Sequence, residues 1–158
     1  MKYHRSVPFC EWKKHMKTLL IFSLLAVSVT SLADSLQPKL ENHFDADFTI
    51  DALHTTDGKT YQMSASGEAG PYGRVYLSYT FTDKQQLRDR GEFTGFAFTQ
   101  SGEKIVTGTL QGVYVKQGAI YKMYTHDTAS NGKFTYAVGT LDFVNKTLSF
   151  KAADVVIE

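Results

Sequence analysis

The chain has 158 residues, of which 42% are hydrophobic, and a formal net charge of +1. This length fits one domain with its own core, and the absence of a basic run argues against nucleic acid as a partner. A single cysteine, Cys10, excludes a fold held together by an intrachain disulfide.

The N-terminal region has the pattern of a secretory signal peptide. Met16 and Lys17 precede an apolar run, 18–29, and Ser31-Leu32-Ala33 then places small residues before Asp34. A basic start, about 7–15 apolar residues and an A-x-A-like end mark a cleaved leader. The run is shorter than the roughly 20 residues of a membrane span. We expect cleavage after Ala33, no membrane span in the mature chain, and a periplasmic or secreted protein.

This interpretation divides the chain into three parts. Residues 1–33 form an N-terminal extension and signal peptide, with Met16 as an alternative start. Residues 34–43 form a flexible polar lead-in that contains Pro38, and residues 44–158 form the folded domain. The mature chain, 34–158, has 12 Lys and Arg against 15 Asp and Glu and contains no cysteine. It therefore folds on its apolar core alone.

Alternating apolar and polar residues predict strands throughout the folded domain. The first is the clearest, with Phe44, Ala46, Phe48, Ile50 and Ala52 on one face. Turn signals at 56–59, 117–118 and 129–132 separate strands, and the polar connector 83–90 is too short for a stable helix. The predicted strands are 44–53, 60–67, 74–82, 92–100, 103–116, 119–126, 133–143 and 147–157.

Short connections between about eight strands predict an all-β domain with antiparallel neighbours. An up-and-down barrel removes the exposed sheet edges, and a two-sheet β-sandwich is the alternative. The strand that contains Glu92-Phe93-Thr94-Gly95 has a Gly-x-Phe-x-Gly-like pattern. In this layout the chain resembles small calycin-type and allene-oxide-cyclase-like barrels, and the resemblance implies a fold but no functional residue.

Four glycines lie on the two central strands. With Ser101-Gly102 as a two-residue hairpin loop, Gly95 falls opposite Gly108 and Gly91 falls opposite Gly112. Glycine in a strand marks a bend or a close approach by another group. The glycines then serve either barrel curvature, with the protein's own aromatic rings filling the space, or a cavity for a ligand.

A ligand cavity would be lined by the inward-facing side chains of the predicted strands. Tyrosine combines an apolar ring with a hydroxyl that needs a partner. Strand parity turns Tyr61 inward as well, and turns Tyr76 and Tyr124 outward. The candidate ligand-binding residues are Met63, Tyr79, Phe93, Leu110, Tyr114 and Tyr121.

Polar residues at strand ends are the candidates for chemistry. If His54 and the His126-Asp127 pair share a rim, an imidazole and a carboxylate can act together as a general base. The acidic ladder of Asp45, Asp47 and Asp51 is interpreted as a solvated strand face. The pattern predicts no metal site and no cofactor.

Three functions remain open from the sequence. The first is an exported barrel that binds a small, largely apolar molecule, and the second is a structural or surface-interaction protein with a filled core. The third is a cofactor-free isomerase or cyclase that uses a tyrosine or His126. The chain lacks a G-x-S-x-G motif, a P-loop and a nucleophilic cysteine, so enzyme activity is left undecided with a non-enzymatic function favoured.

Overall fold

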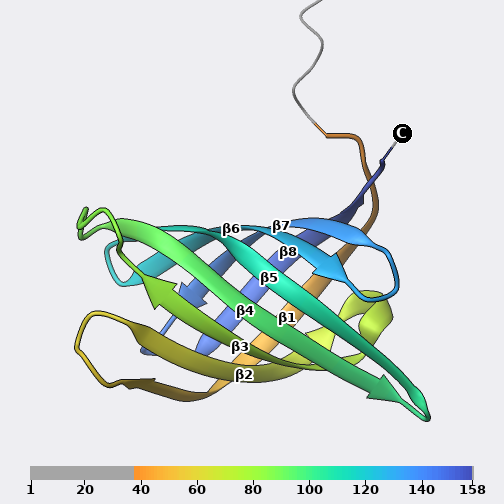
Figure 1. Cartoon of the computed structure of the whole chain (residues 1–158), viewed down its shortest axis with the longest axis horizontal. Helices are drawn as coiled ribbons and strands as arrows, with labels where there is room; N and C mark the ends of the chain where they lie inside the picture. Colours follow the sequence, from red (N-terminus) through yellow and green to blue (C-terminus); the bar gives the residue numbers. More distant parts are fainter. Residues whose placement is uncertain (1–37, 158) are drawn as a thin grey trace, which may run out of the picture. The chain divides into compact units, whose positions relative to one another are not determined.

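A computed structural model describes residues 38–157, so the predicted signal peptide lies outside the described residues. The described chain contains eight strands and one short 3-10 helix, η1 (Figure 1). The strands are β1 (Leu40–Thr55), β2 (Tyr61–Ala69), β3 (Arg74–Thr82), β4 (Arg90–Ser101), β5 (Lys104–Gln117), β6 (Ile120–Ala129), β7 (Phe134–Asp142) and β8 (Thr147–Val155), and η1 is Gly70–Tyr72.

The strands form a closed antiparallel barrel. Each strand pairs with the next along the chain, and β8 pairs with β1 to complete the cylinder. Closure leaves no sheet edge exposed along the barrel wall. The predicted up-and-down barrel is therefore confirmed, and the alternative sandwich is excluded.

The connections lie at two ends of the barrel. The β1–β2, β3–β4, β5–β6 and β7–β8 connections gather at one end, and η1, the β4–β5 turn and the β6–β7 turn lie at the other (Figure 1). Strand β1 begins at Leu40, four residues before the predicted start. The polar connector 83–89 contains a turn and no helix, and the Asp83 carboxylate accepts the backbone N–H groups of Leu87 and Arg88 at 2.8 and 2.7 Å.

A β-bulge changes the inward face of β1. The pairing of β1 with β2 shifts between Ile50 and Ala52, so the extra residue, Asp51, reverses the alternation that follows. Ala52, predicted to face inward, is exposed, and Leu53 takes the inward place opposite Met63. The prediction for Ala52 was wrong because a bulge leaves no mark in a two-residue periodicity.

The β4–β5 hairpin has a different register from the predicted one. Ser101 pairs with Lys104, so the loop is Gly102-Glu103 rather than Ser101-Gly102. Gly102 adopts φ +61°, and glycine at the first loop position suits a hairpin turn of type II′. As a result Gly95 faces Leu110 and Gly112 faces Phe93, and no two glycines face each other.

Aromatic rings cover the glycines inside the barrel. A Cβ added at Gly95 would lie 2.7 Å from Cδ1 of Tyr79, and one at Gly112 would lie 2.7 Å from Cζ of Phe93. The ring of Phe150 covers Gly139 in the same way. At these three positions the missing side chain gives room to a ring and to backbone atoms from neighbouring strands, which supports strong curvature and a filled interior at the same time.

Candidate functional site

A packed layer fills the middle of the barrel. Phe93 is 1% exposed and its ring lies 5.1 Å from that of Tyr79 and 5.7 Å from that of Phe81. The other large side chains that are fully buried are Met63, Met123, Leu141 and Leu148. Tyr79 lines a hollow on one side of this layer and Phe81 lines a hollow on the other side. The interior therefore has two separate hollows rather than one.

The first hollow, the Asp127 cavity, lies toward the end that carries η1. Its volume is about 110 Å³, and its walls are almost entirely apolar. Small-molecule pockets have about 300–1,000 Å³, so this cavity has room only for a few waters or a fragment-sized guest. Its walls include Phe44, Ala46, Tyr72, Val75, Leu77, Tyr79, Ala97, Leu110, Asp127 and Thr135.

Asp127 places a carboxylate in this apolar cavity. The Thr125 hydroxyl donates to it and also lies 3.0 Å from the backbone carbonyl of Gln111. Burial raises the pKa of Asp127 to about 6, although hydrogen bonds from Thr125 and from the backbone of Gln111 act in the opposite direction. Burial and the charge of Asp127 together raise the pKa of the Tyr79 hydroxyl.

Tyr72 contributes a second polar group to the cavity wall. Its hydroxyl is buried and has no hydrogen-bond partner within the part of the chain that the structure describes. A buried polar atom without a partner costs free energy unless a water or a guest satisfies it. Together with Asp127, this hydroxyl makes the small cavity suited to a hydrated or polar fragment rather than to a long apolar molecule.

The second hollow, the basic mouth, lies at the opposite end of the barrel and has a volume of about 990 Å³. Its floor is a closed ring of four aromatic side chains. Phe81 contacts Tyr114 at 5.8 Å between ring centroids, Tyr114 contacts Tyr121 at 5.7 Å, Tyr121 contacts Phe143 at 5.2 Å, and Phe143 contacts Phe81 at 6.3 Å. Tyr114, Tyr121 and Phe143 are only partly buried, so the floor presents apolar surface to the mouth.

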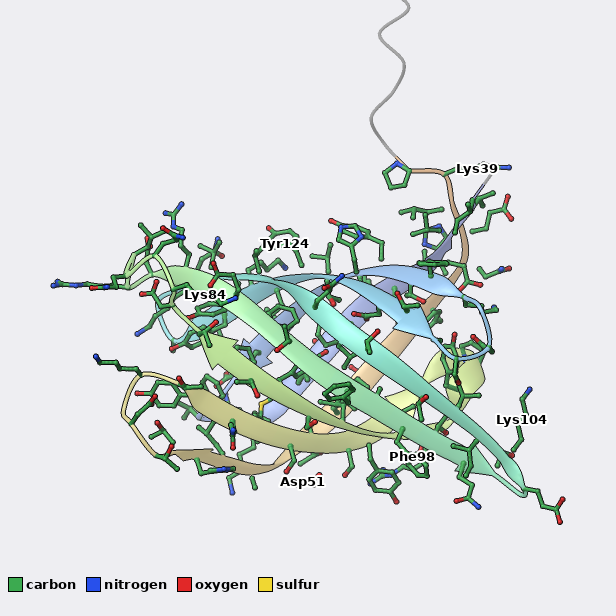
Figure 2. The ribbon with its side chains drawn as sticks, viewed as in Figure 1. Lys39, Asp51, Lys84, Phe98, Lys104 and Tyr124 are labelled. Atoms are coloured by element: carbon green, nitrogen blue, oxygen red, sulfur yellow. The ribbon has the colours of Figure 1, made fainter. Side chains whose placement is uncertain are left out.

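Positive charges surround this aromatic floor. The cations that line the mouth are Lys59, Lys84, Arg88 and Lys116, and Asp83 is the one carboxylate among its lining residues. Within residues 38–157, none of these four cations has a carboxylate within 4.0 Å. The Lys116 ammonium lies 5.9 Å from the centre of the Tyr121 ring, and Lys84 lies at the same end in Figure 2.

Hydrogen bonds fix the backbone of the β3–β4 loop, which carries Lys84 and Arg88. The backbone N–H of Lys116 donates to the carbonyl of Asp89 at 2.6 Å, which ties the loop to β5. Both oxygens of Asp83 are used by backbone N–H groups of the same loop. The negative charge nearest the floor is therefore already engaged, and the cations are free to meet an anion.

The predicted ligand-binding residues are distributed over three levels of the barrel. Met63 and Phe93 belong to the packed layer and line neither hollow. Tyr79 and Leu110 line the Asp127 cavity. Tyr114 and Tyr121 line the basic mouth.

The predicted polar rim residues do not come together. His54 is exposed at the end of β1 beside the mouth, whereas His126 lies on the outer wall of β6, 5.0 Å from the ring of Tyr136. Asp127 points inward because successive residues of a strand face opposite sides. His54 and the His126-Asp127 pair do not share a rim, so the condition set for an imidazole–carboxylate pair is not met.

Several residues of the mouth are absent from the predicted ligand-binding set. Phe81 and Lys116 lie on the inward parity of their strands, beyond Tyr79 and Tyr114, so the alternation pattern already held the signal for them. Phe143 ends the predicted strand 133–143 on the inward parity of Leu141, so the same signal held for it, although β7 ends one residue earlier. Lys84 and Arg88 lie in a connection, where no periodicity shows which way a side chain points.

No protein-family model, curated protein or solved structure matches this chain. Within residues 38–157, no three His, Cys, Asp or Glu side chains converge on a point where a metal ion would be held. The same residues include no helix with the length and apolar character that a membrane crossing requires. The candidate site therefore rests on the geometry of the two hollows.

Proposed function

We propose that this protein is exported and binds a small, largely apolar molecule in the basic mouth. The observation that carries the proposal is the size of that hollow over an aromatic floor. At about 990 Å³ it reaches the upper end of the range of small-molecule sites, whereas the Asp127 cavity is well below it. Burying apolar ligand surface against the rings contributes about 25 cal/mol per Å².

The mouth also has the rigidity that a binding site requires. Its floor is set by inward residues on β3, β5 and β6, whose backbones are fixed by continuous pairing. Phe81 is only 5% exposed and supports the more open rings of Tyr114 and Phe143 from below. A ligand that rests on this floor meets a surface that is already formed, which lowers the ordering cost of binding.

We expect wild-type protein to bind N-phenyl-1-naphthylamine, a neutral apolar dye, with a rise in its fluorescence. Phe143→Ser removes one of the four aromatic side chains that form the floor of the mouth. We expect this variant to bind the dye about tenfold more weakly, since a buried aromatic contact contributes about 1.5 kcal/mol or more. Native mass spectrometry of the purified protein checks in parallel for a ligand carried through purification.

The matched control for this experiment is Phe96→Ser. Phe96 lies on the outer wall of β4 with 67% of its surface exposed, so the same substitution there leaves the mouth intact. Equal binding by both variants, or no dye binding by folded wild-type protein, refutes the mouth as the ligand site.

One observation favours the alternative of a surface-interaction protein. Tyr76 and Phe98 are paired on the outer wall of β3 and β4, both exposed, and Phe96 lies two residues from Phe98. Phe98 is labelled on this wall in Figure 2. Exposed aromatic patches often mark contact surfaces. If Phe96→Ser abolishes a self-association or partner complex while the mouth binds no dye, this alternative replaces the ligand-binding proposal.

Export is tested by the mass of the mature protein. We expect the periplasmic or secreted fraction to contain a chain that begins at Asp34, since small residues precede that position and an apolar run precedes them. N-terminal sequencing and intact mass measure this directly. A mature chain that still carries residues 19–33 contradicts the proposed cleavage.

A further inference from the structure

We infer that the ligand of the basic mouth is an amphipathic anion: an aryl or alkyl tail that carries one carboxylate or sulfonate group. This inference rests on the proposed function and adds the charge of the ligand to it. Four cations line the mouth against one carboxylate, and the folded domain places them around an aromatic floor. An apolar tail on the floor and an anionic head at the rim fit this arrangement.

Three features make the rim charges available to a ligand. First, the lysine and arginine side chains at the rim have no carboxylate partner within 4.0 Å among residues 38–157. Second, the two oxygens of Asp83 accept backbone N–H groups of Leu87 and Arg88. Third, the Lys116 ammonium lies near the Tyr121 ring, so the charge is held directly beside the apolar floor.

Other charged groups near the mouth are already engaged. The Asp89 carboxylate pairs with Arg90 at 3.0 Å, and Asp57 accepts the backbone N–H groups of Lys59 and Thr60 at 2.8 and 2.6 Å. Asp142 accepts the backbone N–H groups of Val144 and Asn145. These three carboxylates therefore stabilise the loops of this end, and the Glu92 carboxylate lies 3.5 Å from the backbone nitrogen of Lys84. Lys59, Lys84, Arg88 and Lys116 are the cations that line the mouth.

Two dyes that differ by one group test the charge of the ligand. 1-Anilinonaphthalene-8-sulfonate is N-phenyl-1-naphthylamine with an added sulfonate. We expect the sulfonate dye to bind about tenfold more tightly, and this advantage to shrink between about 0.01 M and about 1 M salt, where the screening length falls from about 30 Å to about 3 Å. Decanoate is expected to displace both dyes, and decanol to displace them less effectively.

Variants that remove positive charges test which residues bind the sulfonate group of the dye. The double variant Lys84→Gln/Lys116→Gln is expected to weaken binding of the sulfonate dye about tenfold and of the neutral dye less than twofold. The control is Lys39→Gln/Lys104→Gln, which removes the same charge at the opposite end of the barrel (Figure 2). This control is expected to change the affinity for neither dye. Thermal unfolding of each variant checks that it is folded.

The outcomes separate this inference from the proposed function. If the neutral dye binds in a Phe143-dependent way but the sulfonate dye binds no more tightly and ignores the lysine variants, the anionic head is refuted and the apolar site remains. If neither dye depends on Phe143, the proposed function itself fails. Binding to vesicles that contain phosphatidylglycerol, with no displacement by decanoate, assigns the charges to a membrane surface and overturns the inference.

Discussion

Replacing Gly112 with alanine is expected to lower the free energy of unfolding by about 3 kcal/mol and the Tm by about 10 °C. A Cβ at this position would overlap the carbonyl oxygen of Tyr124 and would lie 2.7 Å from Cζ of Phe93 and 2.9 Å from Cα of Thr125. Two of these three neighbours are backbone atoms of the paired strand, and Phe93 belongs to the packed layer. None of them can move without disturbing the barrel, so the added methyl group strains its surroundings.

Gly108→Ala is the control for this prediction. Gly108 lies on the same strand and the same face, four residues away, but a Cβ there would meet its nearest atom, the Thr128 carbonyl oxygen, at 3.5 Å. Alanine is preferred over glycine in a strand by about 0.5–1 kcal/mol, so this variant is expected to be as stable as wild type or slightly more stable. Chemical denaturation of the two variants measures the difference. Equal stabilities contradict the requirement for glycine at position 112.

Replacing Asp127 with asparagine is expected to stabilise the protein at neutral pH and to remove part of its pH dependence. The folded pKa of Asp127, about 6, lies above its ordinary value of 3.8, so the folded state binds the proton more tightly than the unfolded state does. The free energy of unfolding of the wild-type protein is therefore expected to fall as pH rises from about 4 to about 6. Asp127 accounts for about 3 kcal/mol of this decrease. Asparagine keeps the shape without the charge.

The stability difference between Asp127→Asn and wild type isolates this effect from other titrating groups. We expect the difference to favour the variant above about pH 6 and to shrink toward about pH 4. Asp57→Asn is the control, because hydrogen bonds from the backbone of Thr60 and Lys59 lower the pKa of Asp57 to about 2. The stability linked to Asp57 is lost only as pH falls below about 4, outside the window of Asp127. A flat difference for Asp127→Asn refutes a buried, charged carboxylate in the cavity.

The sequence predicted which residues of the strands face the interior, but not how deep in the barrel each of them lies. Tyr114 and Tyr121 were predicted to face inward because they lie on regular strands, and both line the mouth. Met63 and Phe93 had the same signal, yet they belong to the packed layer. Periodicity tells which side of a strand a residue faces, but the depth of that residue along the barrel axis depends on how all the strands are staggered.

The prediction for His126 and Asp127 failed at a different step. The two residues are neighbours in sequence, and both were candidates for a rim that His54 would share. In the barrel they face opposite sides of β6, and His54 lies at the other end. The alternation rule already separated neighbouring residues, whereas the distance between β1 and β6 could come only from the closed topology.

The amino-acid sequence by itself determined the fold class, the number of strands and most strand boundaries, because these depend on local alternation and on turn residues. Only the tertiary structure decided the β1 bulge, the pairing of Gly95 and Gly112 with large side chains and the division of the interior into two hollows. These features depend on the register between strands and on the way side chains from opposite walls meet. A shift of two residues in one hairpin leaves every side chain on its own face but changes which residue it packs against.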